Sequence, residues 1–145
     1  MGCDIHACIQ GQYKGRTYWW DLALDVSIGR NYPLFAAMAD VRNYEGYGIT
    51  PVAQPRGLPD LGLDLGLADE DCPYNTASFA KRWDCDAHSR SWLLTDEFAE
   101  AILRATTVEL WTAGAPTDAA AVLAFMREWE IATGGKARIV FFFDN

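Results

Sequence analysis

The sequence has no apolar run long enough to cross a membrane, because the longest, Ala119 to Met126, falls far short of the roughly 20 residues that a spanning helix needs. Basic residues are also scarce: 12 Lys and Arg stand against 20 Asp and Glu, which gives a formal net charge of −8. A chain this acidic gains little affinity from neutralising a phosphate backbone. These shortages argue against a membrane-spanning protein and against duplex nucleic acid as a partner.

A secretory leader is not evident either, since Asp4 and His6 interrupt any apolar region near the N-terminus. We therefore expect a cytoplasmic protein whose four cysteines stay reduced. Residues that form hydrophobic cores are abundant, since 50% of the 145 residues are hydrophobic. This length and composition predict one globular domain over residues 1–145.

Alternation of apolar and polar residues predicts the strands. From Cys3 to Tyr13, odd-numbered residues are mainly apolar and even-numbered residues, His6 among them, form a second face. A turn at Lys14-Gly15 leads to a second strand over Thr17 to Val26, which completes an N-terminal hairpin. Arg138 to Phe143 is apolar on both faces, which is typical of a central strand.

Helical spacing and capping residues predict the other elements. We expect helices over Pro33 to Arg42, Asn75 to Trp83, Thr95 (as N-cap) to Arg104, and Thr117 to Thr133, a long loop over Tyr44 to Leu67, and a short strand over Val108 to Trp111. The predicted fold class is therefore α+β: a small, mainly antiparallel sheet, made of the N-terminal hairpin and the C-terminal strand, packed with three to four helices.

Several short motifs occur in order along the whole chain. They are Gly2 to His6, Arg30-Asn31-Tyr32 with Leu34-Phe35, Asp40 to Asn43, Pro55 to Pro59, His88-Ser89 with Ser91-Trp92, and Arg138 to Asn145. In these motifs the chain resembles an uncharacterised family of bacteriophage and bacterial proteins whose members begin Met-Gly-Cys-Asp-Ile-His. The resemblance implies a phage-type accessory protein, placed in the cytoplasm of the infected host cell, and it implies no established activity.

Three arginines in these motifs indicate a phosphate site. Arg30 precedes the helix that begins near Pro33, Arg42 closes that helix, and Arg56 lies beside Gly57, where backbone can approach a ligand closely. Guanidinium groups bind phosphate through two parallel hydrogen bonds. The alternative is a structural role, in which Arg30 and Arg42 are solvated helix-end residues and Arg56 holds a loop in place.

The first functional hypothesis is therefore binding of a phosphorylated, nucleotide-like small molecule. The predicted ligand-binding residues are Arg30, Asn31, Tyr32, Arg42, Arg56, Gly57, Ser89, Ser91 and Trp92. The aromatic residues that could stack on a ring, or else belong to the core, are Tyr32, Phe35, Tyr44, Tyr47, Trp83 and Trp92. The resemblance to a phage family adds a purpose, the sequestration of a host immune signal.

The two histidines carry a second hypothesis, a phosphodiesterase or related hydrolase acting on such a nucleotide. His6 and His88 could serve as general base and general acid near neutral pH. In that case Asp4 orients His6, and Ser89 or Ser91 binds a phosphate oxygen. The alternative is that each imidazole is simply hydrogen-bonded within the protein and has no catalytic role.

Metal binding is the less favoured interpretation of the same residues. Cys3 and His6 with Cys85 and His88 have zinc-ligand character, but residues three apart on a strand face opposite ways. An N/O set would use His6, His88, Asp4 and either Asp86 or Asp144. We expect no metal and no cofactor.

A third hypothesis is an inhibitor that binds a basic host protein, since the chain carries a charge of −8 and many aromatic residues. The sequence leaves a homo-oligomer open.

Overall fold

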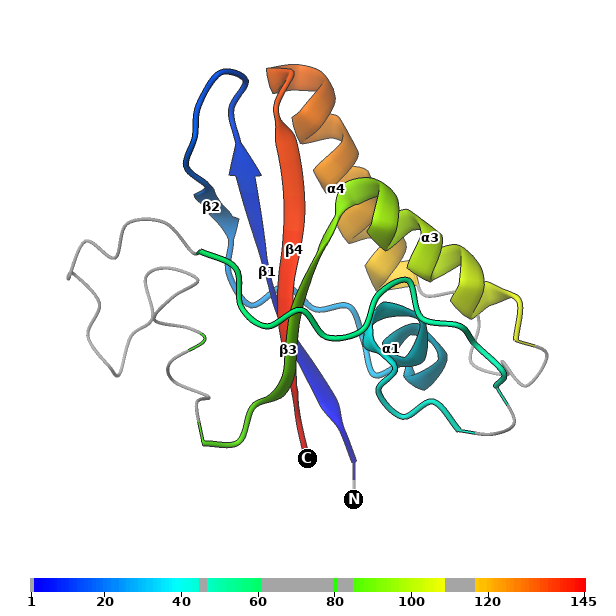
Figure 1. Ribbon diagram of the computed structural model, residues 1–145. Helices are drawn as coiled ribbons and strands as arrows, with labels where there is room; N and C mark the ends of the chain where they lie inside the picture. Colours follow the sequence, from blue (N-terminus) through cyan, green and yellow to red (C-terminus); the bar gives the residue numbers. More distant parts are fainter. Residues whose placement is uncertain (1, 45–46, 61–79, 81–84, 109–116) are drawn as a thin grey trace.

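The computed structural model describes residues 2–44, 47–60, 80, 85–108 and 117–145. The elements with bounds in these residues are β1 (Asp4–Gln12), β2 (Trp20–Ala23), α1 (Tyr32–Ala39), β3 (His88–Leu94), α3 (Thr95–Thr106), α4 (Thr117–Thr133) and β4 (Lys136–Asp144) (Figure 1). The predicted α+β class, with a small antiparallel sheet and packed helices, is confirmed.

The two ends of the chain form the centre of the sheet. Its strand order is β2-β1-β4-β3, and every pairing is antiparallel. β1 and β4 pair along their whole length, from Asp4 opposite Asp144 to Gln12 opposite Lys136. Residues 137–143 are buried, as predicted for a central strand. The antiparallel pairing also places both termini at one end of the sheet (Figure 1), which we call the terminal end (residues 3–6 and 142–145).

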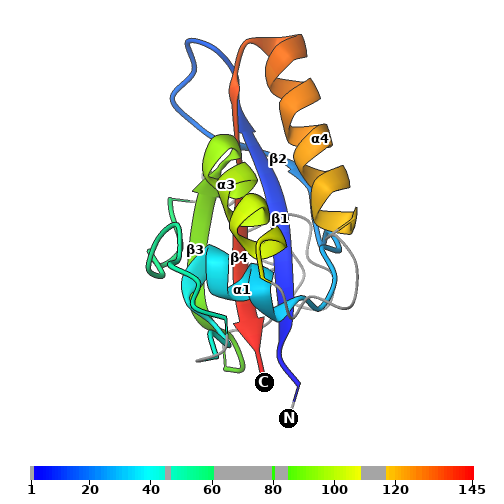
Figure 2. The ribbon, with the colours of Figure 1, turned by 90° about the vertical axis from the view of Figure 1, so that its right-hand side faces the viewer.

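The helices α1, α3 and α4 all cover the same face of the sheet (Figure 2). The alternation predicted for β1 decides which side chains point toward them. Ile9 of β1 and Phe141 of β4 belong to the main core together with Phe35 of α1 and Phe98 of α3. Cys8 and Phe142 point to the opposite face, where they form a smaller buried cluster.

Helix α1 is fixed at both ends by side-chain and backbone chemistry. The Asn31 side-chain oxygen accepts a hydrogen bond from the Leu34 N–H at 2.9 Å, which caps the first turn. The helix stops at Ala39 because Asp40 adopts a left-handed conformation, with φ 61°. The predicted extension to Arg42 is therefore wrong, and Arg42 lies in the loop that follows.

Strand β3 is the main element that the sequence did not predict. His88 to Ser91 is polar and gives no alternating apolar signal, and a bulge separates the paired residues His88 and Ser91. Inside this bulge Ser89 has a φ of 51°, a value that non-glycine residues rarely adopt. An edge strand whose pairing is interrupted in this way lacks the alternation of apolar and polar residues from which strands are predicted.

Other boundaries differ in smaller ways. The predicted second strand over Thr17 to Val26 shortens to Trp20–Ala23. Thr95 is the first residue of α3 rather than its cap, and its hydroxyl donates to the Glu130 carboxylate at 2.9 Å. The helix predicted over Asn75 to Trp83 lies outside the described residues except for position 80. The strand predicted over Val108 to Trp111 also lies outside them, except for Val108.

Candidate functional site

The structure gives each of the three predicted arginines a different environment. Arg30 makes a bidentate ion pair with Asp4, in which its Nε and one terminal nitrogen each donate to a carboxylate oxygen at 2.7 Å. Both side chains are about half exposed, at 53% and 51%. Hydrogen bonding to Arg30 holds the pKa of the Asp4 carboxyl below its ordinary value. The charge of Arg30 is therefore already balanced.

Arg56 lies in the loop after α1 and links it to strand β3 and helix α3. We call Arg56 with Ser91, Trp92 and Glu97 the Arg56 clamp. The Arg56 guanidinium donates to both carboxylate oxygens of Glu97, at 2.9 and 2.6 Å, and lies 4.6 Å from the centre of the Trp92 ring. It also donates to the Trp92 backbone carbonyl at 3.2 Å. The Arg56 N–H donates to the buried hydroxyl of Ser91 at 3.1 Å, and the next N–H, of Gly57, to the Arg90 carbonyl at 2.8 Å. These contacts attach the loop to the outer edge of the sheet.

Arg42 differs from the other two because its guanidinium has no carboxylate partner among the described residues. One terminal nitrogen donates to the side-chain oxygen of Asn145 at 3.0 Å, and the group lies 6.0 Å from the centre of the Tyr32 ring. Its hydrogen bond to the Cys3 thiol is the largest cause that raises the pKa of Arg42. Its backbone is left-handed, with φ 52°. Such conformations are costly for residues other than glycine and recur at functional sites, and Asp25, Asp40 and Ser89 of this chain adopt them as well.

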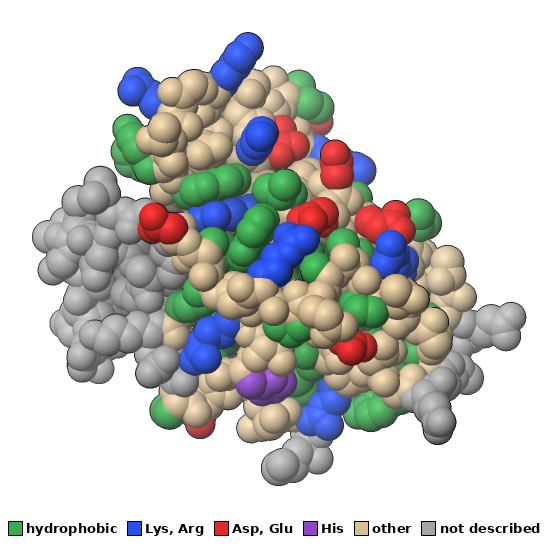
Figure 3. Space-filling view, viewed as in Figure 1, with side chains coloured by type: hydrophobic (Ala, Val, Ile, Leu, Met, Phe, Trp, Pro, Cys, Tyr) green, Lys and Arg blue, Asp and Glu red, His purple; other side chains and the backbone are tan. Residues whose placement is uncertain are grey.

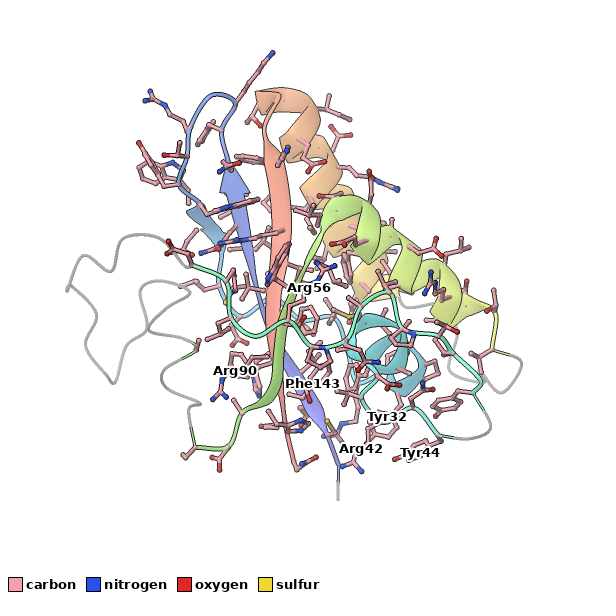
Figure 4. All side chains as sticks on the ribbon, in the orientation of Figure 1. Tyr32, Arg42, Tyr44, Arg56, Arg90 and Phe143 are labelled. Carbon is pink, nitrogen blue, oxygen red and sulfur yellow. The ribbon has the colours of Figure 1, made fainter. Side chains whose placement is uncertain are left out.

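Aromatic rings extend outward from Arg42. The Tyr32 hydroxyl accepts a hydrogen bond from the Cys3 N–H at 3.3 Å, which anchors this ring to the residue immediately before β1. Tyr44 lies edge-on to Tyr32 at 6.1 Å between ring centres, and it is 49% exposed. Figure 4 shows Tyr32, Arg42 and Tyr44 together at the terminal end of the sheet. We call the group of Cys3, Tyr32, Arg42, Tyr44 and Asn145 the Arg42 site.

The Arg42 site and the Arg56 clamp lie apart. Trp92 of the clamp pairs with Val140 of β4, four positions before Asp144 at the terminal end, which is about 14 Å along an antiparallel strand. Figure 4 shows the same separation between Arg42 and Arg56. On the face seen in Figure 3, basic side chains are dispersed and interspersed with acidic ones. The structure therefore does not gather the predicted arginines in one pocket.

The two histidines lie on opposite faces of the sheet. His6 pairs with Phe142 and stacks on it at 5.3 Å, and its Nε2 lies 3.1 Å from a carboxylate oxygen of Asp144. His88 pairs with Phe143, the next residue of β4, and stacks on that ring at 6.0 Å. Because successive residues of a strand point to opposite faces, the imidazoles cannot meet. The structure does not supply the acid–base pair that the hydrolase hypothesis requires.

One ring nitrogen of His88 is also buried, although the residue as a whole is only half-buried. Its Nδ1 lies 3.0 Å from the hydroxyl of Ser89, the neighbouring predicted site residue. Its Nε2 is buried and has no hydrogen-bond partner among the described residues. One ring nitrogen of His88 is therefore hydrogen-bonded within the protein, and the other is out of contact with solvent.

The cysteines of the zinc hypothesis are not brought together with the histidines. Cys3 is fully buried, Cys85 is exposed, and both are free thiols. Burial raises the pKa of the Cys3 thiol, and its hydrogen bond with Arg42 opposes that rise. Within the described parts of the chain, no group of three or more His, Cys, Asp or Glu side chains could hold a metal ion.

Three residues of the Arg42 site, Cys3, Tyr44 and Asn145, were not among the predicted ligand-binding set, and Cys3 was considered only as a zinc ligand. Asn145 is 103 positions from Arg42 in the sequence, and only the pairing of β1 with β4 brings it there. Tyr44 was considered only as one of several aromatic residues, and the sequence gives no sign that its ring is exposed rather than buried. Helix capping, by contrast, fully accounts for Asn31.

Comparison of the chain with family models, with curated proteins and with solved structures finds no match. The resemblance to a phage and bacterial family stays a prediction. No helix in the described residues is both long and apolar enough to span a bilayer.

Proposed function

We propose that the protein binds a small phosphorylated, nucleotide-like molecule at the Arg42 site. The observation that carries this proposal is the guanidinium of Arg42, which is oriented by Asn145 and Tyr32 but has no carboxylate partner among the described residues. A guanidinium in this state offers N–H donors in the planar geometry that phosphate oxygens accept. In an acidic chain, such a group is a local binding point for an anion.

The exposed ring of Tyr44 supports a ligand that contains a base. It lies edge-on to Tyr32, so its position relative to Arg42 is fixed by packing. A nucleobase stacked on an exposed aromatic ring gains about 1–3 kcal/mol. Phosphate on Arg42 and a base against Tyr44 together make a mononucleotide the smallest ligand that uses both groups.

The nearby carboxylates do not oppose this binding strongly. Asp4 is paired with Arg30, and Asp144 is hydrogen-bonded to His6. Each therefore has a partner of its own, which reduces its repulsion of an incoming phosphate. Sequestration of a host immune signal by a phage-type accessory protein is the purpose that the sequence resemblance adds to this proposal.

Thermal denaturation with AMP, ADP-ribose and cyclic dinucleotides tests the proposal. A ligand present at about one hundred times its Kd should raise the Tm by roughly 5–10 °C for a chain of this size. Arg42→Gln should reduce the shift to about half or less, whereas Arg127→Gln, an exposed arginine on α4, should leave it unchanged. Absence of a shift with all three probes at millimolar concentration would contradict the proposal. Chromatography after long incubation should recover the ligand intact.

A further inference from the structure

A cavity of about 300 Å³ lies between the loop after α1 and the C-terminal end of α3. It is lined by Tyr47 to Thr50 on one side and by Arg104, Thr107 and Val108 on the other. None of these residues belongs to the Arg42 site. The size corresponds to the lower end of small-molecule pockets in proteins.

The cavity adjoins the Arg42 site through a row of tyrosine rings. Arg42 lies 6.0 Å from Tyr32, Tyr32 lies 6.1 Å from Tyr44, and Tyr44 lies 5.6 Å from Tyr47, which lines the cavity. An extended molecule anchored on Arg42 could therefore cross the exposed Tyr44 ring and enter the cavity. A single nucleotide that uses Arg42 and Tyr44 would leave the cavity empty.

The polar groups of the cavity suit an uncharged polar unit rather than a second phosphate. Arg104 donates one N–H to Glu100 at 2.8 Å and one to the Thr50 carbonyl at 2.8 Å, which leaves three of its five donors without a partner among the described residues. Because Glu100 balances the charge of Arg104, these donors favour hydroxyl or carbonyl oxygens. The Thr107 hydroxyl donates to the Arg104 carbonyl at 2.8 Å and keeps its lone pairs as acceptors.

The rest of the lining fits the ring portion of such a unit. Ile49 and Val108 are each only 8% exposed and give the cavity an apolar component. Burial raises the pKa of the Tyr47 phenol, so this group remains a neutral hydrogen-bond donor at neutral pH. A few polar groups beside apolar side chains are the usual composition of a small-molecule pocket.

We infer that this cavity is a second subsite and that the ligand is a dinucleotide-type molecule. One nucleotide binds with its phosphate on Arg42 and its base on Tyr44, and the second nucleoside occupies the cavity beside Arg104 and Thr107. This inference rests on the proposed function, because it extends the ligand of the same site.

Calorimetric titration with AMP and with diadenosine 5′,5′-pyrophosphate tests the inference on the full chain. The dinucleotide should bind at least about tenfold more tightly than AMP, since it adds hydrogen bonds and a buried ring. Thr107→Trp, which fills the cavity from its exposed rim, should remove this difference and leave AMP binding unchanged.

Thr106→Trp is the matched control. Thr106 is the neighbouring exposed threonine, its hydroxyl makes the same type of bond, to the Leu103 carbonyl at 2.7 Å, and it does not line the cavity. If Thr107→Trp lowers the Tm, Thr50→Trp closes the cavity from its other wall and should give the same loss.

The outcomes separate the two proposals. Equal affinity of wild type for AMP and the dinucleotide, or an unchanged preference in the cavity-filling variants, overturns the second subsite. In that case AMP binding that depends on Arg42 leaves the proposed function standing. Failure of both probes to bind the wild type overturns the proposed function and the second subsite with it.

Discussion

Arg56 and Arg42 each lie over an aromatic ring, and the comparison between them separates a structural contact from a candidate binding site. Arg56 lies over Trp92 and donates to both oxygens of Glu97. Arg42 lies over Tyr32 and donates to a neutral amide oxygen of Asn145. The ring contact alone therefore does not indicate function.

The two guanidinium groups differ in the side chain that accepts their hydrogen bonds. A carboxylate that receives two hydrogen bonds satisfies both the charge and the geometry of Arg56. An amide oxygen orients Arg42 without balancing its charge, so the group still favours an anion. Both positions combine an arginine with an aromatic neighbour, and the charge of the accepting side chain, a carboxylate for Arg56 and an amide for Arg42, separates their expected roles.

The largest expected effect concerns the core beneath the Arg42 site. Phe143 is fully buried and contacts the rings of Phe35 and His88, so Phe143→Ala should lower the free energy of unfolding by about 3–5 kcal/mol. Urea denaturation measures this loss. Phe125→Ala, at a residue 44% exposed on α4, should cost less than about 1 kcal/mol. Equal losses would show that packing does not hold this end of the sheet.

Exchange of the two arginines for glutamine should separate stability from binding. Arg56→Gln removes a pair whose side chains are 28% and 30% exposed, and it should lower the free energy of unfolding by about 1–2 kcal/mol. Its affinity for AMP should not change. Arg42→Gln should weaken AMP binding about ten- to a hundredfold and leave the urea midpoint nearly unchanged. If both variants lost the same stability and the same affinity for AMP, Arg56 and Arg42 would not differ in role.

Acid titration should sharpen the assignment of Arg56 as a structural residue. Hydrogen bonding to Arg56 holds the pKa of Glu97 below its ordinary value of 4.5. A carboxyl whose pKa is lowered by folding stabilises the folded state above its unfolded pKa, and this stability is lost as pH falls through the folded pKa. The difference in unfolding free energy between wild type and Arg56→Gln should therefore be constant near pH 7 and shrink below about pH 4.5. A difference that is the same at pH 3 and pH 7 would contradict the role of the Glu97 charge.

The smallest effect is expected for the exposed pair of Arg30 and Asp4, which lies close to the Arg42 site. Both side chains are about half exposed, so solvent and salt screen their attraction. Asp4→Asn should shift the Tm only slightly in low salt, and the shift should vanish above about 0.5 M NaCl. AMP binding should be unaffected by Arg30→Gln, since Arg30 is already paired; a large loss of affinity would place Arg30 in the site.

Much of the fold could be predicted because its signals are local. The bounds of α4 agree with the capping and spacing signals that predicted them, and the alternation in β1 correctly assigned Ile9 and His6 to opposite faces. Strand β3 could not be predicted, because its polar residues and its bulge remove the periodicity on which such predictions depend.

The candidate site was only partly predictable. The sequence marked Arg42 and Tyr32 as residues suited to phosphate and ring binding, but it gave Arg30 and Arg56 the same status. Their carboxylate partners, Asp4 and Glu97, lie 26 and 41 positions away in the chain. No local pattern connects residues at such separations.

The sequence by itself determined the positions of α1, α3 and α4, apart from the end of α1, the central strands and the alternation of buried and polar side chains, because each depends on neighbours within a few residues. Tertiary structure alone decided which guanidinium is paired and which remains available, and that His88 lies on the face opposite to His6. The physical reason is that the binding properties of a charged group depend on the groups around it in space. At Arg42 those groups come from both ends of the chain.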